Sequence, residues 1–212
     1  MTPDVWTAPL AAAPLDAVVE VPGSKSLTNR YLVLAALAHG PGRLRGALGS
    51  RDTLLMADAL TALGARVTRT GTDWVVDPID GGSDPEAGPA RDDIRVECGL
   101  AGTVMRFVPP VAALASGEVT FRGDARAGDR PITEVLRALR SVGVSVTGDR
   151  VPFTMHGIGV VRGGTVQIDA SSSSQFVSAL LLAGARYADG VEVLHRGAPV
   201  PSQPHIDMTV TM

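Results

Sequence analysis

Lysine, cysteine and aromatic residues are scarce in this 212-residue chain. A single cysteine, Cys98, excludes an internal disulfide and fits a reducing compartment such as the cytoplasm. Aromatic residues make up only 4% of the sequence and hydrophobic residues 45%, so a core must be built from alanine, valine and leucine. A chain of this length can bury such a core as one large domain or two small ones.

The signals of membranes, secretion, nucleic acid and metals are also missing. No apolar run reaches the roughly 18 residues that a membrane span needs, and residues 1–14 show no signal peptide. A net charge of −3 gives no reason to expect nucleic acid. The four histidines and Cys98 lack ligand spacing. We therefore expect a cytoplasmic protein without a membrane partner, a nucleic-acid partner or a structural metal.

Lys25 is the only lysine among 19 basic residues. It lies in the segment PGSKSLTNR at 22–30, between a short strand expected at 18–21 and an apolar helical run at 31–38. The segment should therefore open a helix, where free backbone N–H groups and the positive end of the dipole favour an anion. Its serines alone would be ordinary N-caps. A lysine between two serines after Pro-Gly instead favours an oxyanion site, to which Ser26 and Arg30 contribute.

The pattern around Lys25 recurs about every 75 residues, which indicates a repeat architecture. Each repeat opens with a strand, a polar helix start with its helix, and a second strand; the second strands are expected at 43–48, 119–122 and 191–195. In the first two repeats a second helix follows, at 53–63 and 132–142, and then two strands around a glycine turn, within 65–76 and 144–155. The unit is therefore βαβαββ, and the fold class is α/β built by repetition. The third unit breaks off at Met212, so we expect a fragment of a longer protein.

If three such units pack around one axis, their polar helix starts converge. The first helices bring 24–30, 102–106 and 171–175, and the second helices bring 51–52, 129–131 and 202–207. Cationic side chains, hydroxyls and helix N-termini together suit a small ligand with phosphate and carboxylate groups.

Simpler readings remain open for parts of this cluster. The serines at 171–174 could form only a turn or a redundant N-cap. We expect Arg51 and Arg106 to form solvated or structural ion pairs rather than ligand contacts, and Cys98 to be a buried small residue. No residues are assigned as acid and base.

The motifs, taken together and in order, resemble those of the 5-enolpyruvylshikimate-3-phosphate (EPSP) synthase family. They are PGSKSxxNR at 22–30, AGTxxR at 101–106, Arg130-Pro131, SSQ at 173–175 and SxPxID at 202–207. The resemblance runs from about Ala17 to the last residue and covers the first half of the family's chain. The sequence around 99–103 is similar to the actinobacterial branch.

The resemblance implies a transferase of the shikimate pathway, which leads to the aromatic amino acids. Members move the carboxyvinyl group of phosphoenolpyruvate to the 5-hydroxyl of shikimate 3-phosphate and release phosphate; no metal or organic cofactor is implied, and glyphosate is the family's inhibitor. The family has two domains, each of three βαβαββ units around a pseudo-threefold axis. Residues 17–212 would be the shikimate-3-phosphate-binding domain with a truncated third unit. Residues 1–16 would pack with the absent second domain, in a monomer.

The resemblance also implies roles for individual residues. Lys25, the one catalytic candidate, would contact both substrates, and Ser26 and Arg30 would hold the shikimate carboxylate. The phosphate of shikimate 3-phosphate would be bound by Ser173, Ser174 and Ser202. Gln175 would lie between the two substrates, and Gly102 and Arg130 would contact phosphoenolpyruvate. His205 would lie near the shikimate ring. The family's acid–base residues lie in the absent half, so the fragment is expected to be inactive alone.

Three residues depart from the family pattern: Leu100 replaces Asn, Phe107 replaces Pro and His205 replaces Tyr. The last affects one ring contact, and the other two could shift the helix that carries Gly102. An alternative is the sister enzyme that uses UDP-N-acetylglucosamine, which usually shows Gly-Ala-Lys-Asn at the first motif and a catalytic cysteine in a loop. Here the first motif is Gly-Ser-Lys-Ser, and Cys98 sits at a strand end. A non-catalytic anion-binding module is the other alternative.

Overall fold

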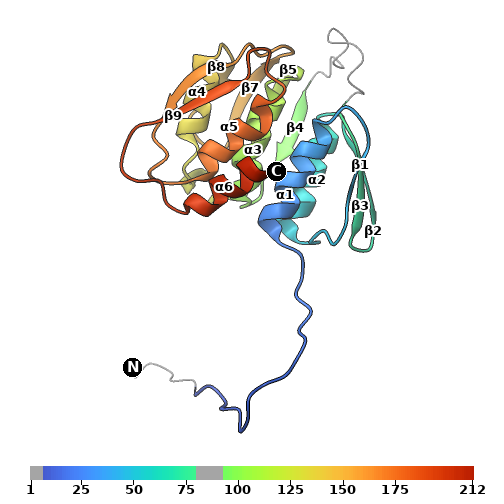
Figure 1. Cartoon of the computed structure of the whole chain (residues 1–212). Helices are drawn as coiled ribbons and strands as arrows, with labels where there is room; N and C mark the ends of the chain where they lie inside the picture. The colour runs from blue at the N-terminus through green and yellow to red at the C-terminus, as the bar shows by residue number, and fades with distance from the viewer. Residues whose placement is uncertain (1–6, 80–92) are drawn as a thin grey trace.

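The computed structural model describes residues 7–79 and 93–212. The strands of the described chain form three separate sheets, each with helices from the same stretch of sequence (Figure 1). The first unit consists of α1 (Lys25–Ala36), β1 (Gly42–Leu44), α2 (Arg51–Ala62), β2 (Arg66–Thr70) and β3 (Asp73–Asp77). Its strands are ordered β1-β3-β2, with both pairs antiparallel.

The second unit is the most complete of the three. It consists of β4 (Ile94–Glu97), α3 (Gly102–Ala112), β5 (Ser116–Arg122), the short 3-10 helix η1 (Ala127–Asp129), α4 (Thr133–Ser141), β6 (Ser145–Thr147) and β7 (Phe153–Ile158). The strand order is β4-β5-β7-β6, and β4 runs parallel to β5. This is the full βαβαββ unit expected from the sequence.

The third unit consists of β8 (Gly164–Ile168), α5 (Gln175–Gly184), β9 (Val191–His195) and α6 (Gln203–Thr211). Strands β8 and β9 pair in parallel, as β4 and β5 do. The repeated α/β architecture predicted from the sequence is therefore confirmed. The helices α1, α3 and α5, one from each unit, pack against one another at the centre (Figure 1).

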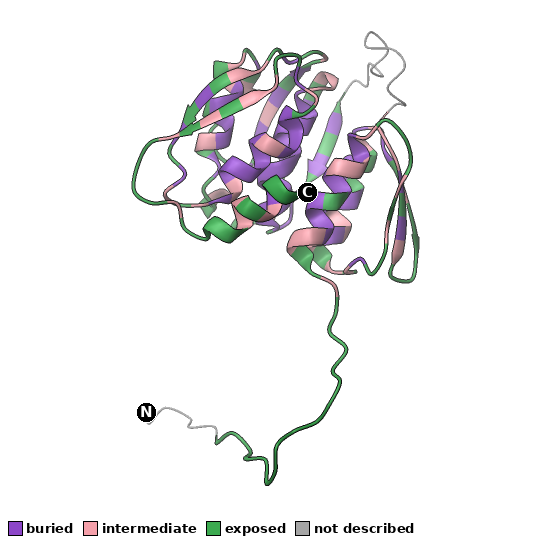
Figure 2. Ribbon diagram, in the orientation of Figure 1, coloured by how far each residue is buried: buried purple, intermediate pink, exposed green. Residues whose placement is uncertain are grey.

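The core lies around these central helices (Figure 2). Every residue of α3 is buried, including its two prolines. Aromatic contacts are few, and the rings of Phe121 and Phe153 stack with centroids 4.5 Å apart. Alanine, valine and leucine fill most of the remaining space, as the composition predicted. Within 7–79 and 93–212, no helix is both long and apolar enough to span a membrane.

The strand predicted at 18–21 is wrong. Residues 14–24 form no regular structure and lead away from the body of the molecule (Figure 1). Val18, Val19 and Val21 are each at least 75% exposed. A strand needs a hydrogen-bonded neighbour. In the other two units the first strand, β4 or β8, pairs with the strand after the central helix. The equivalent partner of the segment at 18–21 would be β1, which the segment does not reach. The strand predicted at 43–48 also ends early, because the chain turns at Gly46 with a φ of 67°.

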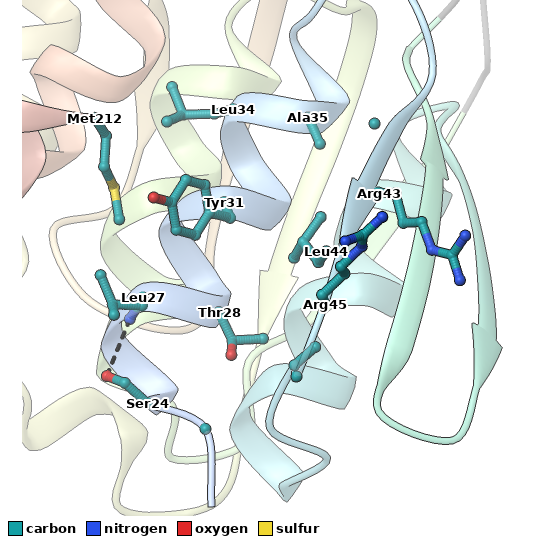
Figure 3. A pocket seen from close by; sticks show the side chains of 14 residues that line it. Ser24, Leu27, Thr28, Tyr31, Leu34, Ala35, Arg43, Leu44, Arg45 and Met212 are labelled. Atoms are coloured by element: carbon teal, nitrogen blue, oxygen red, sulfur yellow. Dashed lines mark hydrogen bonds between the residues drawn. The ribbon is translucent and has the colours of Figure 1, made fainter.

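A groove of about 730 Å³ lies along the unpaired edge of β1 (Figure 3). One wall is the outer face of α1, with Leu27, Tyr31 and Leu34, and the other is the stretch 42–47. The side chain of Met212 closes one end. The groove includes Ser24 and Thr28 of the helix start at 24–30, but Lys25, Ser26 and Arg30 do not line it.

Candidate anion-binding site

Polar side chains join the N-terminal halves of the three central helices. Asn29 Nδ2 donates to Thr103 Oγ1 at 2.7 Å and so joins α1 to α3. The other two links are Arg30 Nη2 to Ser178 Oγ (3.1 Å, α1 to α5) and Arg106 Nη1 to Gln175 Oε1 (2.7 Å, α3 to α5). The N-terminal halves of the three helices therefore meet in one place, as the repeat suggested.

Lys25 lies at the start of α1, at the edge of this meeting point. Ser24 is the N-cap of α1, and its hydroxyl accepts a hydrogen bond from Leu27 N. The Lys25 ammonium is 2.8 Å from Asp52 Oδ2 at the start of α2, and half of the lysine side chain is exposed. Lys25 is thus available to a ligand, which would compete with Asp52. Ser26 is half-buried beside it, and its carbonyl accepts from Arg30.

Arg30 is buried, with only 1% of its surface exposed. Its guanidinium donates to Thr209 Oγ1 (2.7 Å) and to the carbonyl of His205 (3.1 Å), both on α6, besides Ser178 and Ser26. Burial lowers its pKa from the ordinary value, and the ring of Phe107 lies 5.2 Å away. Arg30 therefore fixes α6 against α1, and one N–H of Nη1 has no acceptor within the described chain.

Arg106 occupies a similar position on α3 and is also buried. Burial, and then the charge of Arg130, lower its pKa to about 10, so it stays protonated at neutral pH. A methyl group on Gly102 would lie 2.8 Å from Arg130 Nη1 and 2.9 Å from Arg106 Nη1. Gly102, Arg106 and the exposed Arg130 therefore converge at the start of α3.

The serine segment lies at the start of α5. Ser174 is the buried N-cap residue, but its side chain makes no capping bond. Ser173 is half-buried, and its hydroxyl accepts from Gln175 N at 3.3 Å. The segment therefore turns the chain at 171–172 and supplies one hydroxyl, that of Ser173, to the first backbone N–H of α5, while the Ser174 hydroxyl makes no capping bond.

Ser202 and His205 approach from the start of α6. Ser202 has a left-handed backbone, with φ of 56° and ψ of 49°. This conformation is uncommon for a residue with a side chain, and such residues cluster at functional sites. The carbonyl of Ser202 accepts from His205 N at 2.9 Å, and its hydroxyl makes no capping bond. The hydrogen bonds that Arg30 donates to His205 O and Thr209 Oγ1 hold this segment against the first helix.

The charges of the two buried arginines are not neutralised by the residues around them. Within 7–79 and 93–212, neither Arg30 nor Arg106 has a carboxylate within 4.0 Å. A buried charge is costly unless it is paired. The arrangement therefore favours a ligand that supplies negative charge near these helix starts.

Two expectations about neighbouring residues have opposite outcomes. Arg51 forms the predicted ion pair, 2.9 Å from Asp124. The prediction for Arg106 is wrong, because its partners are the amide oxygen of Gln175 and the carbonyl of Pro131. Cys98 is buried as predicted, and burial raises its pKa to about 12, so it is not poised as a nucleophile.

Asn29 and Asp52 lie in stretches that the sequence placed near the site, but the sequence analysis assigned neither of them a role. Asn29 stands in the first motif, but an asparagine in a helix start suggests a cap, whereas here it is a buried link between units. Asp52 follows Arg51 at the start of α2, one of the helix starts expected at the site, and the structure shows that it contacts Lys25.

Comparison with known proteins decides the family. Residues 10–212 match the family model for EPSP synthase (3-phosphoshikimate 1-carboxyvinyltransferase). This chain belongs to the EPSP synthase family. It is 54% identical over 213 aligned positions to the 3-phosphoshikimate 1-carboxyvinyltransferase of Mycobacterium ulcerans (strain Agy99), a match that covers 98% of this chain.

Solved structures of EPSP synthase show the same fold. Two structures of the enzyme from Acinetobacter baumannii match this chain with a TM-score of 0.70 at 22% sequence identity, over 89% of its length. The present chain covers 47% of the mycobacterial relative and 42% of the Acinetobacter chains. It therefore spans about half the length of the relatives that it matches.

Proposed function

We propose that this chain is the shikimate-3-phosphate-binding half of a 3-phosphoshikimate 1-carboxyvinyltransferase. The observation that carries the proposal is the pair of buried guanidiniums, Arg30 and Arg106, that lack carboxylate partners in the described chain where three helix starts meet. Family membership supplies the identity of the anion: shikimate 3-phosphate and, beside it, phosphoenolpyruvate.

The roles proposed for the site residues are those that the family resemblance implies, and their positions at the helix starts support them. The hydroxyls of Ser173, Ser174 and Ser202 would hold the phosphate of shikimate 3-phosphate, because all three stand at helix starts and those of Ser174 and Ser202 make no capping bond. Lys25 would leave Asp52 to contact both substrates, and Ser26 lies next to it.

Four further residues belong to the proposed site, besides Gln175, which would lie between the substrates. Arg30 would reach the shikimate carboxylate with its one free N–H, His205 would lie near the shikimate ring, and Gly102 with Arg130 would receive phosphoenolpyruvate.

A second domain is part of the proposal. The exposed valines at 18–21 and the open edge of β1 are surfaces that a further domain would cover. We assign residues 1–16 to contacts with that domain; of these, residues 1–6 lie outside the described residues. The complete protein would be a monomeric, cytoplasmic enzyme with 17–212 as its shikimate-3-phosphate-binding domain.

Binding and turnover are expected to separate in this chain. Carboxyvinyl transfer needs a proton delivered to the methylene carbon of phosphoenolpyruvate and one removed from the 5-hydroxyl, by groups of suitable pKa. It also needs a closed site that excludes water. The 212-residue chain is therefore expected to bind shikimate 3-phosphate weakly and to release no phosphate from phosphoenolpyruvate.

Isothermal titration calorimetry tests the proposal directly. Heat on adding shikimate 3-phosphate, with none from UDP-N-acetylglucosamine, is the expected result. The reverse preference would identify the sister transferase, and binding of neither would refute the assignment. A phosphate-release assay on the same preparation, with both substrates, should show no turnover. Turnover near that of an intact enzyme would place the acid and base within these 212 residues.

A further inference from the structure

The Arg106 side chain holds together three separate parts of the candidate site. Its Nε and Nη2 each donate to the carbonyl of Pro131 at 3.0 Å, and its Nη1 donates to Gln175 Oε1 at 2.7 Å. The guanidinium also lies 5.4 Å from the ring centre of Phe176. With 7% of its surface exposed, Arg106 is fixed by these contacts. It connects α3, the stretch after Arg130, and the start of α5.

The contact with Arg106 determines which way the Gln175 amide points. A guanidinium only donates hydrogen bonds, so the amide atom that faces it must be the oxygen. The NH2 group of Gln175 then faces away from Arg106. This NH2 group has no acceptor within the described chain, and it is not fully buried. The residue is half-buried, so the two N–H groups are open to a bound molecule.

We propose that Arg106 is a positioning residue that presents the Gln175 amide to the ligand as a hydrogen-bond donor. At this point the site would then select an oxygen with a free lone pair, in a hydroxyl, carboxylate or phosphate, and reject a donor-only group. The two hydrogen bonds that Arg106 donates to Pro131 O keep the neighbouring Arg130 in place at the same time. A lysine could not make these contacts together, because it lacks the planar fork. The nature of the ligand rests on the proposed function; the orientation of the amide does not.

The main test replaces Arg106 by lysine and uses Arg140 as a matched control. Arg140 also donates from Nε and Nη2 to one carbonyl, that of Val146, but it lies on α4. Both Arg106→Lys and Arg140→Lys should lower Tm. Only Arg106→Lys should weaken shikimate 3-phosphate binding, by about tenfold, the equivalent of about 1.4 kcal/mol. Equal affinities in Arg106→Lys and the wild type would overturn the proposal.

Nuclear magnetic resonance reads the amide itself. In the wild type, the side-chain NH2 resonances of Gln175 should shift when shikimate 3-phosphate is added. In Arg106→Lys the same resonances should change before any ligand is added, because the amide loses its fixed partner. If the chemical shifts of these resonances changed neither with the ligand nor with the substitution, the proposal would be contradicted.

Two variants of Gln175 test the link without a ligand. Gln175→Glu keeps an oxygen that accepts from Arg106, and its carboxylate pairs with the buried guanidinium charge. Its Tm should therefore equal or exceed that of the wild type. Gln175→Leu removes the acceptor and should lower Tm. If both variants lowered Tm equally, Arg106 would not be orienting this side chain. Failure of the wild-type chain to bind shikimate 3-phosphate would refute the proposed function. The Tm values of the two Gln175 variants would still show whether Arg106 orients the Gln175 amide.

Discussion

Asn29 on α1 and Thr103 on α3 form a buried hydrogen bond of 2.7 Å between the first two units. Asn29 Nδ2 donates this bond, while Asn29 Oδ1 is buried without a partner in the described chain. Burying this oxygen without a hydrogen bond lowers the stability of the fold by about 1–3 kcal/mol. The bond therefore does more than fill the core: it sets where the start of α3, with Gly102, lies relative to the start of α1.

Removing the Thr103 hydroxyl should leave the Asn29 amide with no partner at all. We expect Thr103→Val to lower the free energy of unfolding by about 1–3 kcal/mol, and Thr133→Val, at an exposed position, to change it little. The double variant Asn29→Leu with Thr103→Val should be more stable than Thr103→Val, because no buried polar group remains. Urea denaturation measures these three variants, the single variant Asn29→Leu and the wild type. A double variant as unstable as the two single losses combined would show that packing, not polarity, dominates.

Lys25 should contribute to binding and very little to stability. Its ion pair with Asp52 is half exposed, and such pairs contribute at most about 1 kcal/mol. We expect Lys25→Ala to weaken shikimate 3-phosphate binding by about 2–4 kcal/mol with Tm nearly unchanged. Arg162→Ala, which breaks the exposed pair with Asp189, is the control and should change neither quantity. Wild-type affinity in Lys25→Ala would remove Lys25 from the site.

A methyl group at Gly102 should act on Arg130 rather than on the fold. It would meet the guanidinium ends of Arg130 and Arg106 at under 3.0 Å, and the exposed Arg130 can move away. We therefore expect Gly102→Ala to weaken the binding of phosphoenolpyruvate and of glyphosate, measured with shikimate 3-phosphate present, with a small change in Tm. Gly40→Ala, which adds a methyl to open space, is the control. Unchanged binding of both ligands would rule out a close approach at Gly102.

Arg30 should determine the stability of α6. Its bonds to Thr209 and to the carbonyl of His205 are donated by a charged group, and such bonds contribute about 1.5–3 kcal/mol each. We expect Arg30→Lys to speed hydrogen exchange across 203–211 while the second unit keeps its protection. Arg186→Lys, which loses a bond to the carbonyl of Leu37, should leave 203–211 unaffected. Equal exchange in both variants would show that α6 is held by other contacts.

Alkaline pH should destabilise the chain through Cys98. Burial raises the thiol pKa from 9.0 to about 12, so the folded state keeps a proton that the unfolded state loses above pH 9. Stability is therefore unaffected below pH 9 and falls by about 1.4 kcal/mol per pH unit between the two pKa values. Denaturation of the wild type and Cys98→Ala at pH 7 to 11 should show curves that converge as the pH rises. Parallel curves would mean that the thiol ionises in the folded state.

The sequence predicted what local chemistry determines and missed what depends on distant partners. Gly64 and the apolar spacing before it defined the end of α2, and the three helix starts were recognised from their serines and glycines. The strand at 18–21 failed because its valines fit a strand but have no neighbour here. Arg106 was misassigned because arginines usually pair with carboxylates, and the amide that it binds is far along the chain, in another unit.

The bond between Arg30 and Thr209 joins residues 179 positions apart, which sets an order on folding. During synthesis, α1 emerges long before α6, which accepts two of the four hydrogen bonds that the buried Arg30 guanidinium donates. Until then the charge must stay hydrated, so the first unit cannot close over it. Contacts between such distant residues slow folding, because a long loop must be closed before they form. The first helix of this domain is therefore expected to reach its final packing only when the last one docks.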